Sequence, residues 1–123
     1  MLKHNLYKYQ RHFPNKNRYT LSFKIGTYTF HGLYLPPPNH NDNIQCKELP
    51  DQLEIDDHTI IFGDFNARSK VITQDHQNNS RGLHVPEPWS LTNDLLTWNG
   101  ALARGQHSFR TNAGYSIIDI FMS

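Results

Sequence analysis

Apolar and polar positions alternate most clearly in the first third of the chain. The segments RYTLSFK and TYTFHGLYL are rich in Tyr, Thr and Phe and are separated at Gly26, which is typical of two strands joined by a tight turn. The prolines from Pro36 to Pro38 cannot continue a strand. The pattern therefore predicts a β-hairpin from about Arg18 to Leu35.

The middle of the chain mixes helical, extended and irregular patterns. In the acidic stretch 39–57, apolar residues recur at near-helical spacing, which predicts one or two short helices. The continuous apolar run at 58–63 is typical of a strand buried on both faces. Residues 68–88 have the composition of a loop.

The last third of the chain predicts one helix and two strands. WSLTNDLLTW fits a helix with Ser90 as its N-cap and an apolar face; that face comprises Leu91, Leu95, Leu96 and Trp98. HSFRT and YSIIDIFM fit two strands joined through the turn-prone residues 112–114. Because strands alternate with helices only in part, the predicted fold class is α/β (α+β) with a layered sheet core.

Length and charge suggest one domain with a basic arm. A chain of 123 residues is enough for one domain. Residues 1–18 carry five Lys and Arg and no acid, whereas 39–57 carry six acids and one Lys. We therefore expect a basic arm over 1–17 and a domain over 18–123. The arm could contact phosphates, or could simply be a solvated chain end.

Composition also limits the setting of the protein. No apolar run of 18 residues exists, and no apolar signal region follows Met1, so no membrane partner is expected. The single cysteine, Cys46, excludes an intramolecular disulfide and a Cys-rich zinc site. An intracellular location is expected, the nucleus included.

The strongest chemical signal is TIIFGDFNAR, Thr59 to Arg68. A glycine lets the backbone turn at a strand end, and Asp64 and Asn66 follow Gly63 directly. A carboxylate can orient or deprotonate a water, and an amide can donate to a charged oxygen. The alternative is an Asx-turn, in which both side chains satisfy loose backbone groups.

FGDFNAR resembles the central motif of the endonuclease/exonuclease/phosphatase superfamily, which includes exonuclease III, abasic-site endonucleases and the endonuclease domains of non-LTR retrotransposons. GLYLPPP is similar to the family strand ending in Tyr-x-Pro, and YSIIDIFMS to the later Ser-x-x-Asp strand. NNSRGLHV fits the Asn-x-Arg-Gly-x-x-Leu of retrotransposon members. The resemblance covers residues 18–123 and implies a partial four-layer α/β sandwich.

The resemblance also implies roles for four residues. Asp64 would orient or activate the attacking water, and Asn66 would hold the scissile phosphate. Tyr34 would stabilise the charge on that phosphate, and Asp119 would brace a catalytic histidine. Two of these have simpler alternatives. Tyr34 could be a half-buried strand tyrosine, and Asp119 could pair with a structural arginine such as Arg110.

Further residues are implicated in binding DNA. By resemblance, the hairpin from Thr111 to Ser116 would lie near the substrate. Arg81 is interpreted as a solvated loop charge that touches phosphate. The resemblance implies DNA as partner, Mg²⁺ as cofactor and fusion to a reverse transcriptase in a full-length element; RNA, a phosphoinositide or a smaller phosphoester remain open as substrates.

Two family elements have no counterpart in the sequence. The metal-binding glutamate lies on a strand before the matched region, but no acid precedes Asp42. The histidine segment lies beyond the Ser-x-x-Asp strand, and the sequence ends at Ser123. We therefore expect a domain truncated at both ends, with Asp64 as a possible metal ligand, or an inactive remnant that keeps only a phosphate-binding corner.

Two other acid–histidine pairs are candidates to replace the missing histidine segment. Asp57-His58 precedes the strand that ends at Asp64, about 20 Å away at 3.3 Å per residue, and cannot serve. Asp75-His76 lies in the predicted loop and stays open. A metallophosphatase would need Asp-x-His on an earlier strand and a later Asn-His to hold two metals, and the sequence has neither in the right order.

Overall fold

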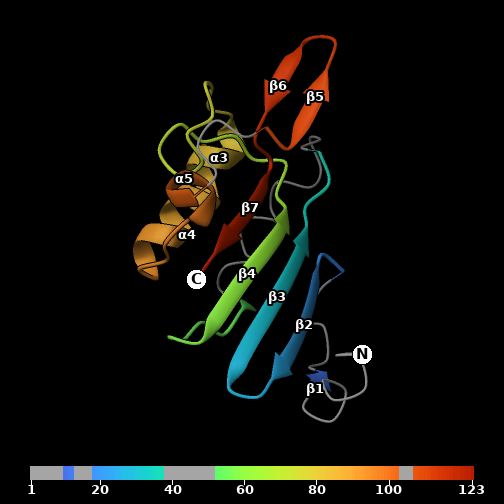
Figure 1. Ribbon diagram of the computed structural model, residues 1–123, viewed down its shortest axis with the longest axis vertical. Helices are drawn as coiled ribbons and strands as arrows, with labels where there is room; N and C mark the ends of the chain where they lie inside the picture. Colours follow the sequence, from blue (N-terminus) through green and yellow to red (C-terminus); the bar gives the residue numbers. More distant parts are fainter. Residues whose placement is uncertain (1–9, 13–17, 38–51, 103–106) are drawn as a thin grey trace.

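The computed structural model describes residues 10–12, 18–37, 52–102 and 107–123 (Figure 1). Its centre is a five-stranded sheet in the order β1-β2-β3-β4-β7. Strands β3 and β4 are parallel, and the other neighbours are antiparallel. The strands are β1 (Gln10–His12), β2 (Thr20–Ile25), β3 (Tyr28–Tyr34), β4 (Thr59–Asp64) and β7 (Asp119–Met122).

The predicted hairpin and central strand are confirmed. Strands β2 and β3 pair antiparallel across a turn in which Gly26 has φ +59, a conformation that favours glycine. Strand β4 matches the predicted strand at 58–63 with a shift of one residue, since it begins at Thr59 and ends at Asp64. Strand β1 lies inside the range 1–17 that was expected to form an arm, and it pairs with β2. Part of that range therefore belongs to the sheet.

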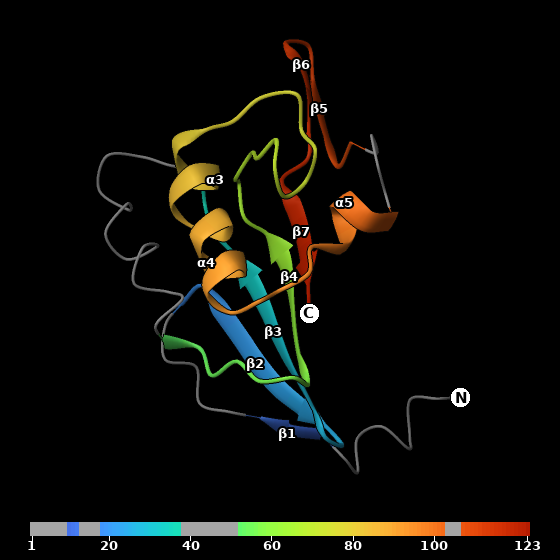
Figure 2. The ribbon, with the colours of Figure 1, turned by 90° about the vertical axis from the view of Figure 1, so that its left-hand side faces the viewer.

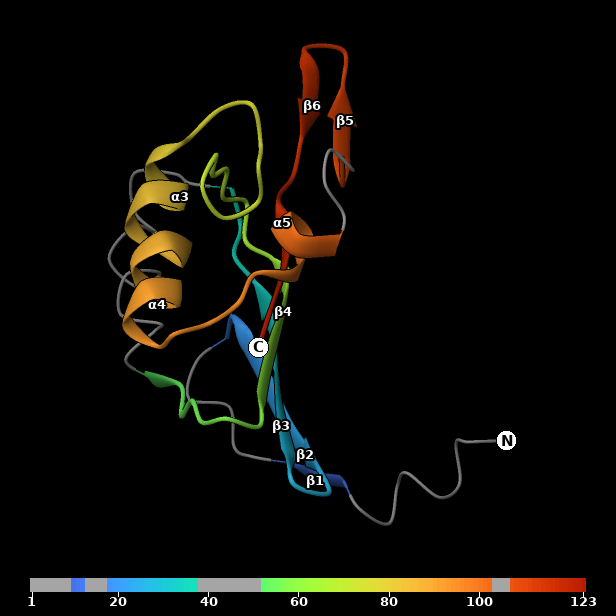
Figure 3. The same ribbon diagram turned by 60° about the vertical axis from the view of Figure 1, so that its left-hand side comes forward.

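One face of the sheet carries the hydrophobic core. Leu33, Ile61 and Ile120 are buried there together with Trp89. Trp89 belongs to helix α4 (Pro86–Thr92), which follows helix α3 (Ser80–His84). Figures 2 and 3 show both helices against this face.

The opposite face, here called the open face, is also rich in apolar side chains. Alternation along the strands places large ones from β2, β3, β4 and β7 on it, among them Leu21, Phe23, Phe30, Phe62 and Phe121. The rings of Phe23 and Phe30 stack at 5.1 Å, and those of Phe62 and Phe121 lie 6.5 Å apart. Within the described ranges no helix covers this face (Figure 3). The expectation that β4 is buried on both faces is wrong for this side, where Phe62 is only half-buried.

The helical predictions for residues 68–98 were partly wrong. The expected loop contains α3 and the first turn of α4, because Asn79 caps α3 and Pro86 begins α4. Ser90 is inside α4 rather than at its N-cap, and its hydroxyl donates to the Glu87 carbonyl. The expected apolar face is not buried as a whole, since Leu91 is 81% exposed. A third helix, α5 (Trp98–Leu102), lies beside β7.

The predicted C-terminal strand is two strands with a break. Strands β5 (Phe109–Thr111) and β6 (Gly114–Ser116) form a separate hairpin, and β7 begins only after Ile117 and Ile118. The β5–β6 hairpin stands beyond the end of the main sheet where β3 and β4 end (Figures 1 and 3).

The fold agrees with the predicted class in coarse terms, as a mixed sheet with few helices. Of the stretch 39–57 that was predicted to hold one or two short helices, residues 39–51 lie outside the described residues. Residues 53–57 are described and are not helical, so the prediction is wrong for them. In the described part of the chain, no helix has the length and apolar character needed to cross a membrane.

Candidate functional site

Three of the predicted site residues lie in one row across the sheet. Tyr34 of β3 is the register partner of Asp64 of β4, and Asp64 is the partner of Asp119 of β7. Residues opposite one another on neighbouring strands project from the same face. The row therefore lies at one end of the open face, directly below the β5–β6 hairpin (Figure 1). The resemblance implied a shared site for these residues, and the strand register places the three side by side; their chemical roles stay predictions.

Gly63 brings β4 close to β3 beside this row. A Cβ atom at Gly63 would lie 1.9 Å from the carbonyl oxygen of Leu33, and the residue has φ +143. Only glycine tolerates both conditions. The amide of Leu35 then donates to the Asp64 carbonyl at 2.8 Å, so the chain stays paired just past the row.

Asp64 and Asn66 form the Asx-turn that the sequence left as an alternative. The Asn66 amide donates to Asp64 Oδ1 at 2.9 Å, and Asn66 Nδ2 donates to the Leu35 carbonyl at 2.7 Å. Asn66 has φ +47, which asparagine accepts more readily than most residues. Within the described residues, Asp64 Oδ2 has no such partner. The turn and the proposed chemistry are therefore compatible, because they use different oxygens.

The Asp64 carboxyl lies in an environment that favours its neutral form. Burial raises the pKa of Asp64 and is the largest effect; the hydrogen bond from the Asn66 amide lowers that pKa in part, the nearby charge of Asp119 raises it, and Arg81 lowers it least. A carboxylate with a raised pKa is a better proton acceptor than an ordinary aspartate. Asp64 thus has the electrostatics of a group that can orient or deprotonate a water.

Arg81 is not the solvated loop charge that the sequence suggested. It lies in α3 with 5% exposure, and its Nη1 donates to the carbonyls of Pro36 and Phe65. These carbonyls follow the ends of β3 and β4, immediately past Tyr34 and Asp64. Arg81 therefore braces the two strand ends from behind the row, and a contact with phosphate stays a prediction.

Asp119 projects into solvent rather than into the core. It is exposed, and its apolar neighbours Ile120 and Met122 face the other side. The alternative pairing with Arg110 is not observed, because the Arg110 guanidinium lies 5.1 Å from the centre of the Tyr115 ring. Tyr34 is likewise 58% exposed, somewhat more than a half-buried strand tyrosine would be, and its role stays a prediction.

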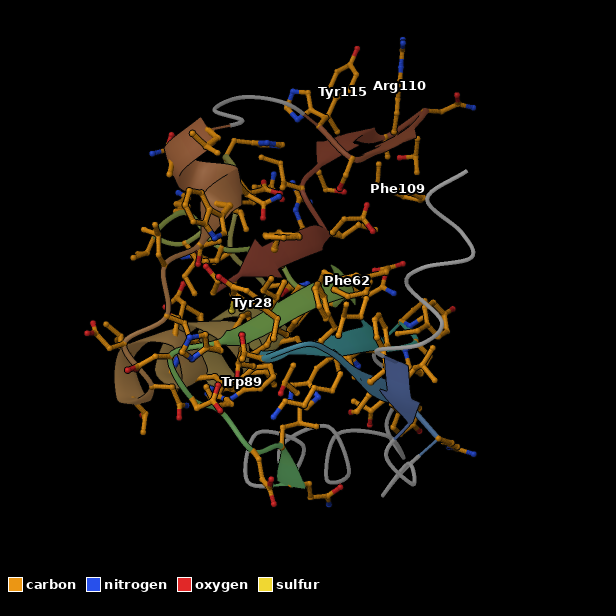
Figure 4. The ribbon with its side chains drawn as sticks, turned by 60° about the horizontal axis from the view of Figure 1, so that its bottom comes forward. Tyr28, Phe62, Trp89, Phe109, Arg110 and Tyr115 are labelled. Atoms are coloured by element: carbon orange, nitrogen blue, oxygen red, sulfur yellow. The ribbon has the colours of Figure 1, made fainter. Side chains whose placement is uncertain are left out.

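The β5–β6 hairpin presents a cationic and aromatic surface. His107 stacks on the same Tyr115 ring at 4.8 Å. Arg110 and Tyr115 project together away from the body of the molecule (Figure 4). Of the two polar residues implicated here by the sequence, Thr111 is exposed, but Ser116 is buried, with 7% exposure. Only Thr111 of the two is accessible to a ligand.

The two acid–histidine pairs lie at different places in the fold. Asp57 and His58 precede β4 at the end opposite Asp64, as expected. Asp75 has a fully buried side chain that forms an ion pair with Arg68 at 2.9 Å and accepts the Ile117 amide at 2.8 Å. These bonds give Asp75 a structural role, and Asp75 Oδ1 also contacts His76 Nδ1 at 3.2 Å. A catalytic role for Asp75-His76 stays a hypothesis that these contacts do not test.

Two residues that sequence reasoning missed hold the backbone of Asp119. Asn99 of α5 donates from Nδ2 to the Asp119 carbonyl and accepts the Phe121 amide with Oδ1, both at 2.8 Å. Ser108 Oγ accepts the amides of Ile118 and Asp119 at 3.0 and 3.1 Å. No local motif marks either residue, because both contacts join segments that are distant in sequence.

The described residues offer an incomplete metal site. Asp64 and Asp119 supply two carboxylates, which are suitable ligands for Mg²⁺. However, no group of three or more His, Cys, Asp or Glu side chains in these residues could together hold a metal ion. The residues present therefore do not by themselves fit a Mg²⁺ ion.

Comparison with solved structures shows the fold. The chain is similar to the endonuclease domain of TRAS1, a telomere-specific non-LTR retrotransposon, with a TM-score of 0.72 and 17% sequence identity. The match covers 92% of this chain and 52% of that domain, so the chain spans about half of its length. No protein-family model matches the sequence, and no curated protein matches it. The likeness supports an endonuclease-type fold.

Proposed function

We propose that this chain is one half of a nuclease domain that hydrolyses DNA phosphodiester bonds. The observation that carries the proposal is the row formed by Tyr34, Asp64 and Asp119 across three neighbouring strands. Asn66 follows the row directly. The endonuclease-type fold and the row of site residues support the same function from independent directions.

Each residue in the row has a role that its surroundings support. Asp64 orients or deprotonates the attacking water with its raised pKa. Tyr34 is exposed and can donate from its hydroxyl to a phosphate oxygen. Asn66 uses one N–H of its side-chain amide on the Leu35 carbonyl, and the second N–H of that amide can donate to developing negative charge. Asp119 orients a histidine supplied from outside the described residues.

The open face explains how half a domain would be completed. Large apolar side chains on an exposed sheet face usually mark a surface that packs against another layer. A second sheet on this face would give the four-layer sandwich that the sequence resemblance implies. Because the row lies at the end of the same face, that second layer would border the row and could add the missing oxygen ligand and histidine.

The β5–β6 hairpin is the proposed DNA contact. Arg110 and Thr111 are exposed on it, and a guanidinium suits a phosphate while an aromatic ring suits a base or sugar. The hairpin stands next to the row, so a duplex bound to it would pass over Asp64 and Asp119.

A second candidate function is an inactive remnant that retains the phosphate-binding corner. The observation in its favour is the incomplete metal site of the described residues. In this case the row and the hairpin would bind nucleic acid, and no bond would be cleaved.

A plasmid-nicking assay with Mg²⁺ separates these candidates. It compares the chain with a chimera that adds a Glu-bearing strand before Arg18 and a Ser-Asp-His segment after Ser123. We expect background nicking from the chain and clear nicking from the chimera. Loss of one charge-stabilising donor typically costs about 10²–10³ in rate. In the chimera, Asn66→Ala should therefore reduce nicking by about that factor, and Asp64→Asn should abolish it.

The matched control is Asp56→Asn. Asp56 is a hydrogen-bonded aspartate in the turn before β4, at the far end of the strand from Asp64, so nicking should persist. A folded chimera that does not nick would favour the inactive remnant. Nicking by the chain alone, abolished by Asp64→Asn, would support the site and show that the added segments are dispensable.

A further inference from the structure

The edge of the segment that joins the β5–β6 hairpin to β7 is held by side chains. The Tyr115 carbonyl accepts from Arg68 Nη2 at 3.1 Å, and the Ile117 amide donates to Asp75 Oδ2 at 2.8 Å. In extended backbone, a carbonyl and an amide two residues apart point to the same side, where a neighbouring strand would normally bind them. Arg68 and Asp75 take the place of that strand.

Arg68 and Asp75 are themselves joined by a two-pronged ion pair. Arg68 Nη2 contacts Asp75 Oδ1 at 2.9 Å, and Arg68 Nε contacts Asp75 Oδ2 at 3.2 Å. The Asp75 side chain is fully buried, and that of Arg68 is 23% exposed. Such a geometry fixes direction as well as distance. Arg68 and Asp75 are therefore held together by their ion pair, and each binds one backbone group of the same extended segment.

The segment from Tyr115 to Ile117, which Arg68 and Asp75 hold, connects the proposed DNA contact to the carboxylate row. Tyr115 belongs to the hairpin, and Asp119 begins β7 only two residues after Ile117. Ser108 Oγ, at the base of the hairpin, accepts the Asp119 amide at 3.1 Å. Among the described residues, the hairpin makes no strand pairing with the main sheet. A change in its direction would consequently strain the bonds at Tyr115 and Ile117 first.

We propose that Arg68 and Asp75 are positioning residues that fix the direction of the β5–β6 hairpin relative to Asp119, so that DNA on the hairpin reaches the row. The part that concerns DNA rests on the proposed function; the part that concerns the hairpin does not. The simpler alternative is an ion pair that only stabilises the loop between β4 and α3. That alternative predicts lower stability without a change in hairpin direction.

Residual dipolar couplings measured on the ¹⁵N-labelled chain test the direction of the hairpin. In Asp75→Asn, the couplings of amides 109–116 should change or shrink, while those of β2, β3 and β4 stay as in the unmodified chain. The matched control, Asp56→Asn, removes another hydrogen-bonded carboxylate and should leave both sets unchanged. Arg68→Lys is the milder variant, because it keeps the charge but loses the planar fork. Unchanged hairpin couplings in either folded variant would overturn the proposal.

A double-mutant cycle on DNA binding tests the connection to function. Fluorescence anisotropy with a labelled duplex compares Asp75→Asn, Arg110→Ala and the double variant. Loss of one Arg contact should weaken binding by about tenfold. If Asp75 acts by placing Arg110, the double variant should be little weaker than the worse single variant. Multiplying effects would refute positioning. If the unmodified chain does not bind the duplex, the DNA function fails, whereas the couplings still decide the hairpin proposal.

Discussion

Replacing Gly63 with alanine would disturb the place where the backbones of β3 and β4 meet beside the carboxylate row. The added Cβ atom would lie 1.9 Å from the Leu33 carbonyl oxygen, so one of the strands must shift. The substitution also forces alanine to adopt φ +143. Two costs are therefore combined at this position, a conformational one and a steric one.

The two costs can be separated with a matched glycine. Gly114 in the hairpin has φ +140, and a Cβ atom there would meet no atom within 4 Å. A residue in a sparsely populated conformation costs about 1–3 kcal/mol, and overpacking typically adds about 1–3 kcal/mol. We expect Gly114→Ala to lose the first amount and Gly63→Ala to lose about 2–6 kcal/mol, the sum of both.

Urea denaturation followed by far-UV circular dichroism and by tryptophan fluorescence measures the difference. Trp89 is only 2% exposed and lies in the core, so its fluorescence reports on the sheet and helices together. With a slope of about 2 kcal/mol per molar urea, a steric cost of about 2 kcal/mol lowers the midpoint of Gly63→Ala by about 1 M relative to Gly114→Ala. Equal midpoints for the two variants would refute the close contact with Leu33.

Two further predictions concern the loop between β4 and α3. Asn79→Ala should lower the free energy of unfolding by about 1–3 kcal/mol, because Asn79 Oδ1 accepts the amides of Gly82 and Arg68; Asn79→Asp, which keeps the acceptor, should lose less, and urea midpoints that do not rank in this order would contradict the cap. Burial raises the pKa of Asp75, but Arg68 and the amides of Ile117 and Gln77 outweigh it and leave that pKa below its ordinary value. The stability from Asp75 is therefore complete above about pH 4 and is lost as the pH falls through the lowered pKa, so the stability gap between the unmodified chain and Asp75→Asn should narrow from pH 7 to pH 3. A constant gap would contradict the ion pair.

The sheet and the row were predictable from sequence because their signals are local. The Tyr, Thr and Phe alternation identified the β2–β3 hairpin, and the apolar run before Gly63 identified β4. A strand end also fixes where its last side chains lie, so Asp64 and Tyr34 could be expected at one edge of the sheet. The parallel register that makes them direct neighbours is a tertiary fact that no local pattern encodes.

The helices were harder to predict because they are short and their caps lie in polar sequence. Helix α3 spans five residues and includes Gly82, so it has no apolar periodicity to detect. Asn79 before it and Pro86 at the start of α4 were usable start signals. The prediction for Arg81 was wrong for the same reason. Because α3 was not detected, Arg81 was expected to be a solvated charge in a loop, whereas it lies in a helix that packs on two strand ends and is buried.

The break in the C-terminal strand arises from contacts with distant segments. YSIIDIFM has a continuous strand pattern, yet Ile117 and Ile118 lie between β6 and β7. Their amides donate to Asp75 and Ser108 instead of to a neighbouring strand. Partners that are 42 and 10 residues away in sequence leave no trace in the local pattern, so the break between the predicted hairpin and β7 could not be foreseen.

Asp64 and Asp119 are register partners at the end of the open face, and the proposed site depends most directly on this juxtaposition. Carbonyl-detected NMR titration of the Asp64 carboxyl, in the unmodified chain and in Asp119→Asn, tests this. Because burial and the Asp119 charge raise the pKa of Asp64, its midpoint should lie above that of an ordinary aspartate and should fall when Asp119 is neutralised. An ordinary or lowered midpoint that does not respond to Asp119→Asn would contradict the site.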